Sequence, residues 1–534
     1  MNPAAAERED GTTMWRALAA RVTRCVSSRS APAVGGVVTA LIAWWVWGSL
    51  RQVPVYHDES AYLLQAGLFA SGRWTAPGPP LPEFFEQYHV IVTPVFAAKY
   101  WPGHALLMVP GVWLGLPGLI PVLLSGLTGA LCFALARRVA GPWVAAGAWF
   151  FWTTAPRVVF FRASYFSEVT TGALWLLGWW ALLDWYETGR RGGLLTLAAC
   201  AGWTAITRPL TAVAFAIPVA IVLLRRSYAR RSWRDLGLAA ALGGVIVGIV
   251  PLWNARTTGD WRLTPYALYA RQYFNFGMPG SFGLDTTATT APERSLPPDM
   301  QRFDAEQREM VRSHTVAALP RELVQRLRQI GDDMWHGWRV VFLPFAVLGL
   351  FALSAAGIYA VASAALLIVV HLAFAHPPFW SLYYYELQPV LAFLTALGVA
   401  VAAPRVAQWL GNARLSRAVV VVVCSAAFLL AVRDLVALHR GLARRREYAR
   451  GFLTLVHRIP EPKAIVFVRY APDHYIHRSL IVNQPDWERA HAWIVYDRGP
   501  DNARLVAIAP DRAPYVFDEA TGTLTRLSSP VSSR

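Results

Sequence analysis

Lysine is almost absent from this chain of 534 residues, although lysine and arginine together number 50. Lys99 and Lys463 are the only two lysines. The formal net charge of +17 is therefore carried by arginine, and short arginine clusters alternate with apolar blocks. Such alternation is how membrane proteins mark their cytoplasmic loops. The positive charge thus indicates membrane topology and does not favour a nucleic-acid partner.

Cysteine is scarce as well. The four cysteines form no CxxC pair, and three of them lie within apolar runs, which excludes a disulfide framework and a cysteine-ligated zinc site (Cys25, Cys132, Cys200 and Cys424). The nucleotide-binding signatures GxxxxGK[ST] and GxGxxG after a strand are missing too. No predicted cytoplasmic loop is long enough for a nucleotide-binding domain. Any chemistry must therefore use a lipid-borne or extracytoplasmic substrate.

Apolar residues are abundant, at 55% of the chain. They gather in blocks of about 15–20 residues, which is the length that crosses the hydrocarbon core of a bilayer. This predicts an all-α polytopic membrane protein with about eleven transmembrane helices. The basic segment 1–32 is expected in the cytoplasm, as part of an uncleaved signal anchor ahead of the multi-span domain at 33–443. Outer loops are expected at 51–117 and 254–338, and a hairpin of two spans at 339–373.

The apolar segment 104–116 is short for a span and contains Pro110. If it lies in the outer interface, Arg137 and Arg138 fall on the cytoplasmic side, as the positive-inside rule requires. From about residue 444 the chain changes character. Short β-type runs such as AIVFVRY and AWIVYD alternate with Pro, Asp and Asn, which predicts a small extracytoplasmic α/β domain at 444–534.

Ionisable side chains near the ends of spans cost free energy and therefore indicate function. The stretch YHDES at 56–60 places Asp58 and Glu59 directly after the first span. A carboxylate in this position is able to act as a general base. Alternatively, Asp58 caps a helix N-terminus and both acids favour the helix dipole. Under the predicted topology, four further places face the same outer side (Lys99, Glu168 with Arg162, Arg208, and Glu386).

Each of these four places also has a purely structural explanation. Glu168 and Arg162 would form an interfacial ion pair, and Lys99 would extend its ammonium towards the interface. Arg208 would cap the turn before a helix that starts with proline, and Glu386 follows three tyrosines of an aromatic belt. Alternatively, Lys99 and Arg208 meet a phosphate group. The shared side of all five places favours a functional site.

These segments resemble the integral-membrane GT-C glycosyltransferases, specifically the bacterial relatives of protein O-mannosyltransferases and lipid A aminoarabinose transferases. The resemblance covers about residues 33–400 and rests on six pieces in order: DES at 58–60, KYWPGHALLM at 99–108, FFRASYFSEV at 160–169, TRPL at 207–210, WNARTTGDWRLTPY at 253–266 and YYYELQPVLAFLTALG at 383–398. Enzymes of this family take a sugar from a polyprenyl-phosphate carrier at the outer face of the membrane.

The resemblance implies an inverting transfer to a hydroxyl of a cell-envelope glycan, lipid or protein at the bacterial cytoplasmic membrane. It makes Asp58 the general base, with Glu59 supporting it and Glu168 as the second acid of the site, where the family often has Asp. A divalent cation, Mg²⁺ or Mn²⁺, would be held by Asp58 and Glu168. The residues expected to bind the donor phosphate are Lys99, Arg208 and Arg162. The residues expected to contact the substrates are His57, Tyr100, His104, Tyr384 and Glu386.

Three other classes remain as alternatives. A transporter or flippase for a lipid-linked glycan predicts ionisable groups at mid-membrane and broken helices in corresponding halves. A non-catalytic membrane scaffold would work through its C-terminal domain. A ligase or polymerase using a polyprenyl-diphosphate donor stays within glycan chemistry. The charges at outer boundaries favour the glycosyltransferase over the first two, whereas the sequence does not separate it from the third.

Overall fold

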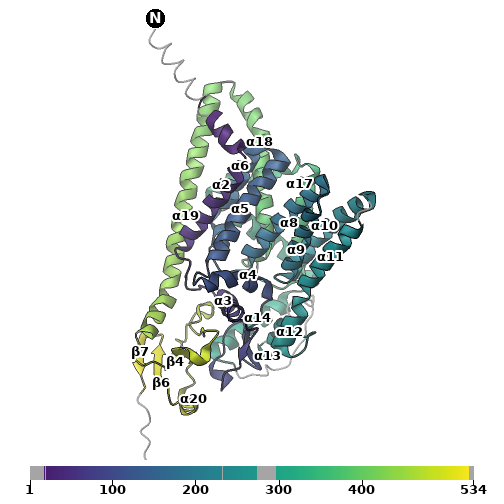
Figure 1. The fold of residues 1–534 in the computed structure, drawn as a ribbon. Coiled ribbons are helices and arrows are strands. Elements are labelled where there is room, and N and C mark those ends of the chain that lie inside the picture. Colours follow the sequence, from purple (N-terminus) through teal and green to yellow (C-terminus); the bar gives the residue numbers. More distant parts are fainter. Residues whose placement is uncertain (1–16, 18–19, 231–232, 274–295, 528–534) are drawn as a thin grey trace, which may run out of the picture.

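The computed structural model describes residue 17 and residues 20–230, 233–273 and 296–527. Most of the predicted basic segment 1–32, and residues 274–295 of the predicted loop 254–338, lie outside this description. Long helices run side by side as a bundle, and a small sheet domain lies at one end of it (Figure 1). This end is called the domain end below.

The bundle is formed by apolar helices with the following bounds: α2 Ala31–Trp47, α5 Leu119–Ala140, α6 Pro142–Thr154, α8 Glu168–Thr188, α9 Arg191–Ala205, α10 Pro209–Arg230, α11 Trp233–Val247, α12 Ile249–Thr258, α16 Leu343–Leu350, α17 Ala355–Leu372, α18 Gln388–Leu410 and α19 Ala413–His457. Among the described residues, six helices are long and apolar enough to cross a membrane, and a bent pair that includes α2 makes a seventh. A multi-pass membrane protein is thereby confirmed, whereas the count of eleven spans stays a prediction.

Further helices are α3 His57–Ala70, α4 Pro102–Trp113, α7 Pro156–Arg162, α13 Pro265–Tyr273, α14 Pro298–Ser313, α15 Leu319–Trp335 and α20 Asn502–Ile508. The 3₁₀ segments are η1 Pro82–Phe84, η2 Val316–Ala318, η3 Gly337–Phe342, η4 Ser381–Leu387, η5 Ile476–Arg478, η6 Trp487–Arg489 and η7 Gly499–Asp501. Helix α4 has 12 residues, or about 18 Å. It is therefore too short to cross a bilayer, in agreement with the interfacial segment predicted at 104–116.

The C-terminal domain has a four-stranded sheet in the order β5-β4-β6-β7, with β4 Ala464–Arg469, β5 Ala492–Tyr496, β6 Ala513–Asp518 and β7 Thr523–Arg526. Strands β5, β4 and β6 are parallel, and β7 is antiparallel to β6. This is the α/β character predicted from the sequence. The predicted domain boundary at 443/444 falls inside α19, a single helix of 45 residues, and the sheet begins only at Ala464.

The C-terminal domain packs on the segment that follows α3. This segment contains a second, three-stranded sheet in the order β1-β3-β2, with β1 Ala76–Pro77, β2 Val90–Ile91 and β3 Val95–Ala98. Phe84 and Phe85 belong to one hydrophobic core with Phe467 and Trp493 of the C-terminal domain.

Hydrogen bonds also stabilise the contact between the C-terminal domain and the segment that follows α3. The hydroxyls of Tyr88 and Tyr496 both donate to Asp299 Oδ2, over 3.1 and 2.8 Å. The backbone N–H of Asn483 donates to Gln87 Oε1 over 3.1 Å. Because these bonds join three separate segments, the C-terminal domain is held at the domain end of the bundle.

Candidate active site

A cavity of about 500 Å³ opens at the domain end of the bundle. Its walls come from the starts of α3, α8 and α10, from the segments before α4 and α18, from α7, α13 and α14, from the end of α17, and from the C-terminal domain. The charged and histidine residues that line it are His57, Asp58, His89, Lys99, Glu168, Arg208, His371 and His477. Four of the predicted charged site residues therefore meet in one cavity.

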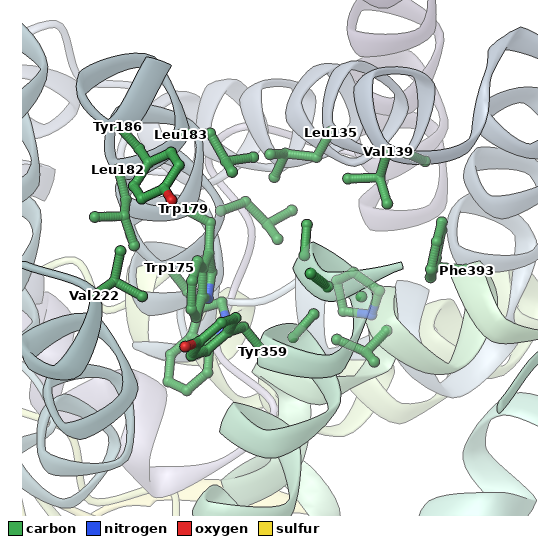
Figure 2. A pocket seen from close by; sticks show the side chains of 18 of the residues that line it. Leu135, Val139, Trp175, Trp179, Leu182, Leu183, Tyr186, Val222, Tyr359 and Phe393 are labelled. Carbon is green, nitrogen blue, oxygen red and sulfur yellow. The ribbon is translucent and has the colours of Figure 1, made fainter. Parts of the chain in front are cut away.

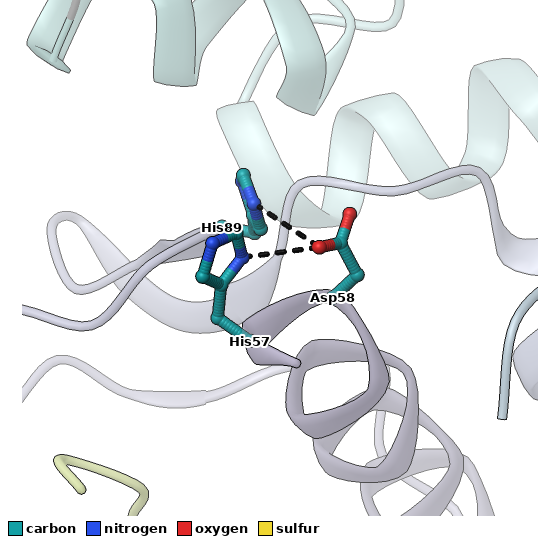
Figure 3. A group of neighbouring side chains, drawn as sticks. All are labelled: His57, Asp58 and His89. Atoms are coloured by element: carbon teal, nitrogen blue, oxygen red, sulfur yellow. Dashed lines mark ion pairs between the residues drawn. The ribbon is translucent and has the colours of Figure 1, made fainter. Parts of the chain in front are cut away.

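Asp58 stands in the first turn of α3, where the chain turns back after α2. Tyr100 donates its hydroxyl to Asp58 Oδ1 over 2.5 Å. The other oxygen, Oδ2, lies 3.1 Å from His57 Nδ1 and 3.7 Å from His89 Nε2. Figure 3 shows both imidazoles facing this oxygen. The carboxylate is 34% exposed because it faces the cavity.

The electrostatic surroundings keep the Asp58 carboxyl ionised. Burial by itself raises its pKa, but the neighbouring imidazoles of His89 and His57 and the hydroxyl of Tyr100 outweigh burial and hold the pKa well below its usual range. An ionised carboxylate that reaches a cavity is able to accept a proton from a bound hydroxyl.

Glu59, predicted to support the base, is only 2% exposed and does not line the cavity. Its carboxylate accepts backbone N–H bonds from Val55 over 2.7 Å, Tyr56 over 3.1 Å and Tyr165 over 2.9 Å. The capping role considered for this stretch thus belongs to Glu59, while its neighbour Asp58 faces the cavity. Glu59 fixes the start of α3 and, through Tyr165, joins it to the segment that leads into α8.

Arg208 is buried between two carboxylates. Its Nη1 lies 3.2 Å from Glu168 Oε1 and 3.5 Å from Glu386 Oε1, and its guanidinium lies 5.3 Å from the centre of the Tyr383 ring. Its Nη2 is buried and has no hydrogen-bond partner among the described residues. A buried, unsatisfied N–H group on a permanently charged side chain suits an anionic ligand in the cavity.

Lys99 is only 5% exposed and lies among aromatic rings. Its Nζ is 4.6 Å from the ring centre of Tyr266 and 4.5 Å from that of Tyr269, which are cation–π distances. Burial lowers the pKa of Lys99 to about 7, although the negative charge of Asp58 opposes this change. The ammonium form of Lys99 is therefore less favoured than that of an exposed lysine, and an anionic ligand beside it would favour this form.

Four other predicted site residues do not line the cavity: Arg162, His104, Tyr384 and Glu386. Arg162 donates to Thr153 O over 2.6 Å, deep in the bundle. His104 bonds to Thr170 Oγ1 over 2.8 Å. Tyr384 bonds to His376 Nε2 over 3.0 Å, whereas Glu386 stands behind Arg208, which does line the cavity.

Sequence reasoning missed several residues of the cavity wall, among them His89, Tyr266, His371, Tyr475 and His477. None of them stands at the end of a predicted span beside another charge, so the signal that revealed Asp58 is lacking. Only the tertiary contacts bring them to the site.

One group of side chains has the composition of a metal site. His57, Asp58 and His89 each offer a ligand atom within 4.8 Å of the others. His57 Nδ1 and His89 Nε2 face Asp58 Oδ2 over 3.1 and 3.7 Å. Two imidazoles and a carboxylate fit a transition metal better than Mg²⁺, which prefers oxygen ligands. Glu168, expected as a ligand with Asp58, does not belong to this group and pairs with Arg208 instead.

A second cavity, of about 490 Å³, lies further along the bundle and is lined almost entirely by apolar side chains. It runs between α5, α8, α10, α17 and α18, and Figure 2 shows Trp175, Trp179, Tyr359 and Phe393 around it. Helices α8, α10 and α17 line both cavities. Along α8, the charged site at Glu168 is about 16 Å from Trp179.

Comparison with known proteins gave no matching protein-family model and no matching curated protein. Solved structures are similar. ArnT from Cupriavidus metallidurans bound to undecaprenyl phosphate aligns over 92% of this chain and 91% of that chain, with 16% identity and a TM-score of 0.48. In the apo state the coverages are 90% and 88%, with 18% identity and a TM-score of 0.46.

The archaeal oligosaccharyltransferase AglB from Archaeoglobus fulgidus, in complex with an inhibitory peptide and a dolichol-phosphate, aligns over 95% of this chain and 75% of that chain, with 10% identity and a TM-score of 0.44. ArnT and AglB are both GT-C glycosyltransferases, the class that the sequence resembles. At these identities and TM-scores the similarities do not assign a function, and the assignment of the site rests on the side chains of this chain.

The lowered pKa of Lys99 is directly testable, because the chain has only one other lysine. Acetylation of the protein over a range of pH, followed by mass spectrometry, should give a reactivity midpoint for Lys99 near 7, with the exposed Lys463 as internal reference. A bound phosphate favours the ammonium form, so a phosphate-bearing lipid should move the midpoint upward, and its affinity should fall as the pH rises above about 7. A midpoint close to the ordinary 10.5 would contradict the desolvated environment.

Proposed function

We propose that the protein is a membrane glycosyltransferase that moves a sugar from a polyprenyl-phosphate carrier to a hydroxyl acceptor, with Asp58 as general base. The observation that carries this proposal is the shared cavity, in which an ionised carboxylate stands together with the two cations Lys99 and Arg208. A base and a phosphate-binding pair are the two parts that such a displacement needs.

In the proposed reaction, Asp58 accepts the proton of the acceptor hydroxyl while the acceptor oxygen attacks the anomeric carbon. The bond from this carbon to the phosphate oxygen breaks, and its electron pair leaves with the lipid phosphate. Lys99 and Arg208 stabilise the negative charge that develops there. Attack from the face opposite to the leaving group inverts the anomeric carbon.

The site is proposed to face the outer side of the cytoplasmic membrane. Arg138 pairs with Glu187 at 2.6 Å, and Arg226 donates to Tyr186 O over 2.9 Å. Both arginines therefore gather near the end of α8, whereas Glu168 begins this helix at the cavity. Because basic clusters mark the cytoplasmic side, the cavity belongs to the opposite side.

Replacement of the base should separate chemistry from donor binding. Asp58→Asn should lower the rate of sugar transfer by about 10²–10⁴-fold, because the amide cannot accept the proton, while the affinity for the donor changes little. The measurement is transfer by purified protein in lipid, with a panel of labelled polyprenyl-phosphate sugars. Asp486→Asn, a partly exposed carboxylate of the C-terminal domain, is the matched control. Full activity of Asp58→Asn would overturn the proposal.

A divalent cation would be held by His57, Asp58 and His89, and when bound it would supply positive charge beside the reacting groups. The expected result is that the purified protein retains a transition metal after dialysis, measured by elemental mass spectrometry, and that His89→Ala loses it. His491→Ala, in the C-terminal domain, should retain it. Metal-free protein with full transfer activity after exhaustive chelation would remove the cation from the proposal.

The second cavity is proposed to hold part of the polyprenyl chain, because it is apolar and its lining helices continue from the charged site. Ala360 lines it, whereas Ala362 on the same helix is exposed on the outside of the bundle. Ala360→Trp should raise KM about tenfold for a long-chain donor but not for a short-chain donor, since each excluded CH₂ costs about 0.8 kcal/mol. Ala362→Trp is the control. Equal KM changes for both donors would place the chain elsewhere.

A further inference from the structure

The C-terminal domain reaches the active-site cavity through the turn around η5. Tyr475 and His477 of this turn line the cavity, and His477 Nδ1 lies 3.0 Å from His57 Nε2. The two histidines are 420 residues apart in the chain. The bond therefore joins the C-terminal domain directly to the residue that precedes the proposed base.

The turn that carries His477 is braced from several sides. Arg302 of α14 donates to Pro472 O over 3.3 Å and to His474 O over 3.2 Å. Glu519, after β6, accepts the Ala471 N–H and a bond from His474 Nδ1, both over 2.8 Å. These bonds tie the turn to α14 and to the sheet at once, so that His477 is held in a fixed position.

His57 links this fixed position to the base. Its ring stacks on Tyr88, with centroids 4.9 Å apart and planes 19° from parallel. One ring nitrogen, Nε2, meets His477, while the other, Nδ1, lies 3.1 Å from Asp58 Oδ2. A hydrogen bond to one nitrogen of an imidazole decides the proton state and orientation of the other. The bond to His477 thus determines the state of His57 Nδ1. This nitrogen either donates its proton to the Asp58 carboxylate or offers a lone pair to a cation.

We propose that His477 is a positioning residue of the active site: by holding His57, it orients the Asp58 carboxylate, and the C-terminal domain thereby completes the site. This inference rests on the proposed glycosyl transfer and adds a function to a domain for which the sequence suggested no site residue.

The test compares three variants of the full-length protein in the same transfer assay. His477→Ala removes the bond to His57 and should lower kcat by about 10–100-fold, the usual cost of losing a partner that orients a reacting group. The donor and acceptor KM values should change less than about threefold. His477→Asn keeps a polar atom at the place of Nδ1 and should recover most of kcat. His491→Ala, on a histidine that contacts Pro462 O at the other end of the sheet, should behave as wild type.

Each other outcome is decisive. If His477→Ala keeps kcat while its acceptor KM rises, then His477 contacts the acceptor and does not position Asp58. If the Asn and Ala variants are equally impaired, then the bond to His57 is not what matters. Wild-type kinetics of His477→Ala, with Asp58→Asn inactive, would overturn this inference alone. Activity of Asp58→Asn would instead overturn the proposed function. Thermal unfolding in detergent identifies a variant that has lost its fold, and His477→Asn then carries the test.

Discussion

The arrangement of the site depends on one buried carboxylate that does not face the cavity. Glu59 accepts backbone N–H groups from both sides: Val55 and Tyr56 lead into α3, and Tyr165 leads into α8. One side chain thus sets the position of Asp58 relative to Glu168. Each buried N–H group left without its partner costs about 1–3 kcal/mol. The geometry of the cavity is therefore built on a residue that contributes nothing to its surface.

The adjacent pair Asp58 and Glu59 also shows what the sequence is able to predict. Charge at the edge of a span is costly, so the stretch as a whole predicts a site, and Asp58, Lys99, Glu168 and Arg208 line one cavity. Neighbouring residues of a helix point about 100° apart, so only one of two adjacent acids faces a given cavity. Which one faces it depends on the rotation of α3, and that is set by tertiary contacts.

The structure differs from the sequence prediction at two kinds of residue, for different reasons. Arg162 and His104 have the right residue type and lie near the right motifs, but they satisfy backbone and side-chain groups inside the bundle. His89 and His477 carry no local signal and reach the cavity only after two distant segments have packed together. The predicted boundary at 443/444 lies inside α19, because the arginines there end the apolar run but not the helix. A helix is able to leave the bilayer without a break.

The unbroken helix α19 connects the two ends of the protein mechanically. Helix α19 has 45 residues and is about 68 Å long, and it connects the far end of the bundle to the domain that carries His477. Helices tilt in response to the thickness of the surrounding bilayer. Because one unbroken helix joins the far end of the bundle to the domain that carries His477, the tilt of α19 and the position of this domain are mechanically coupled.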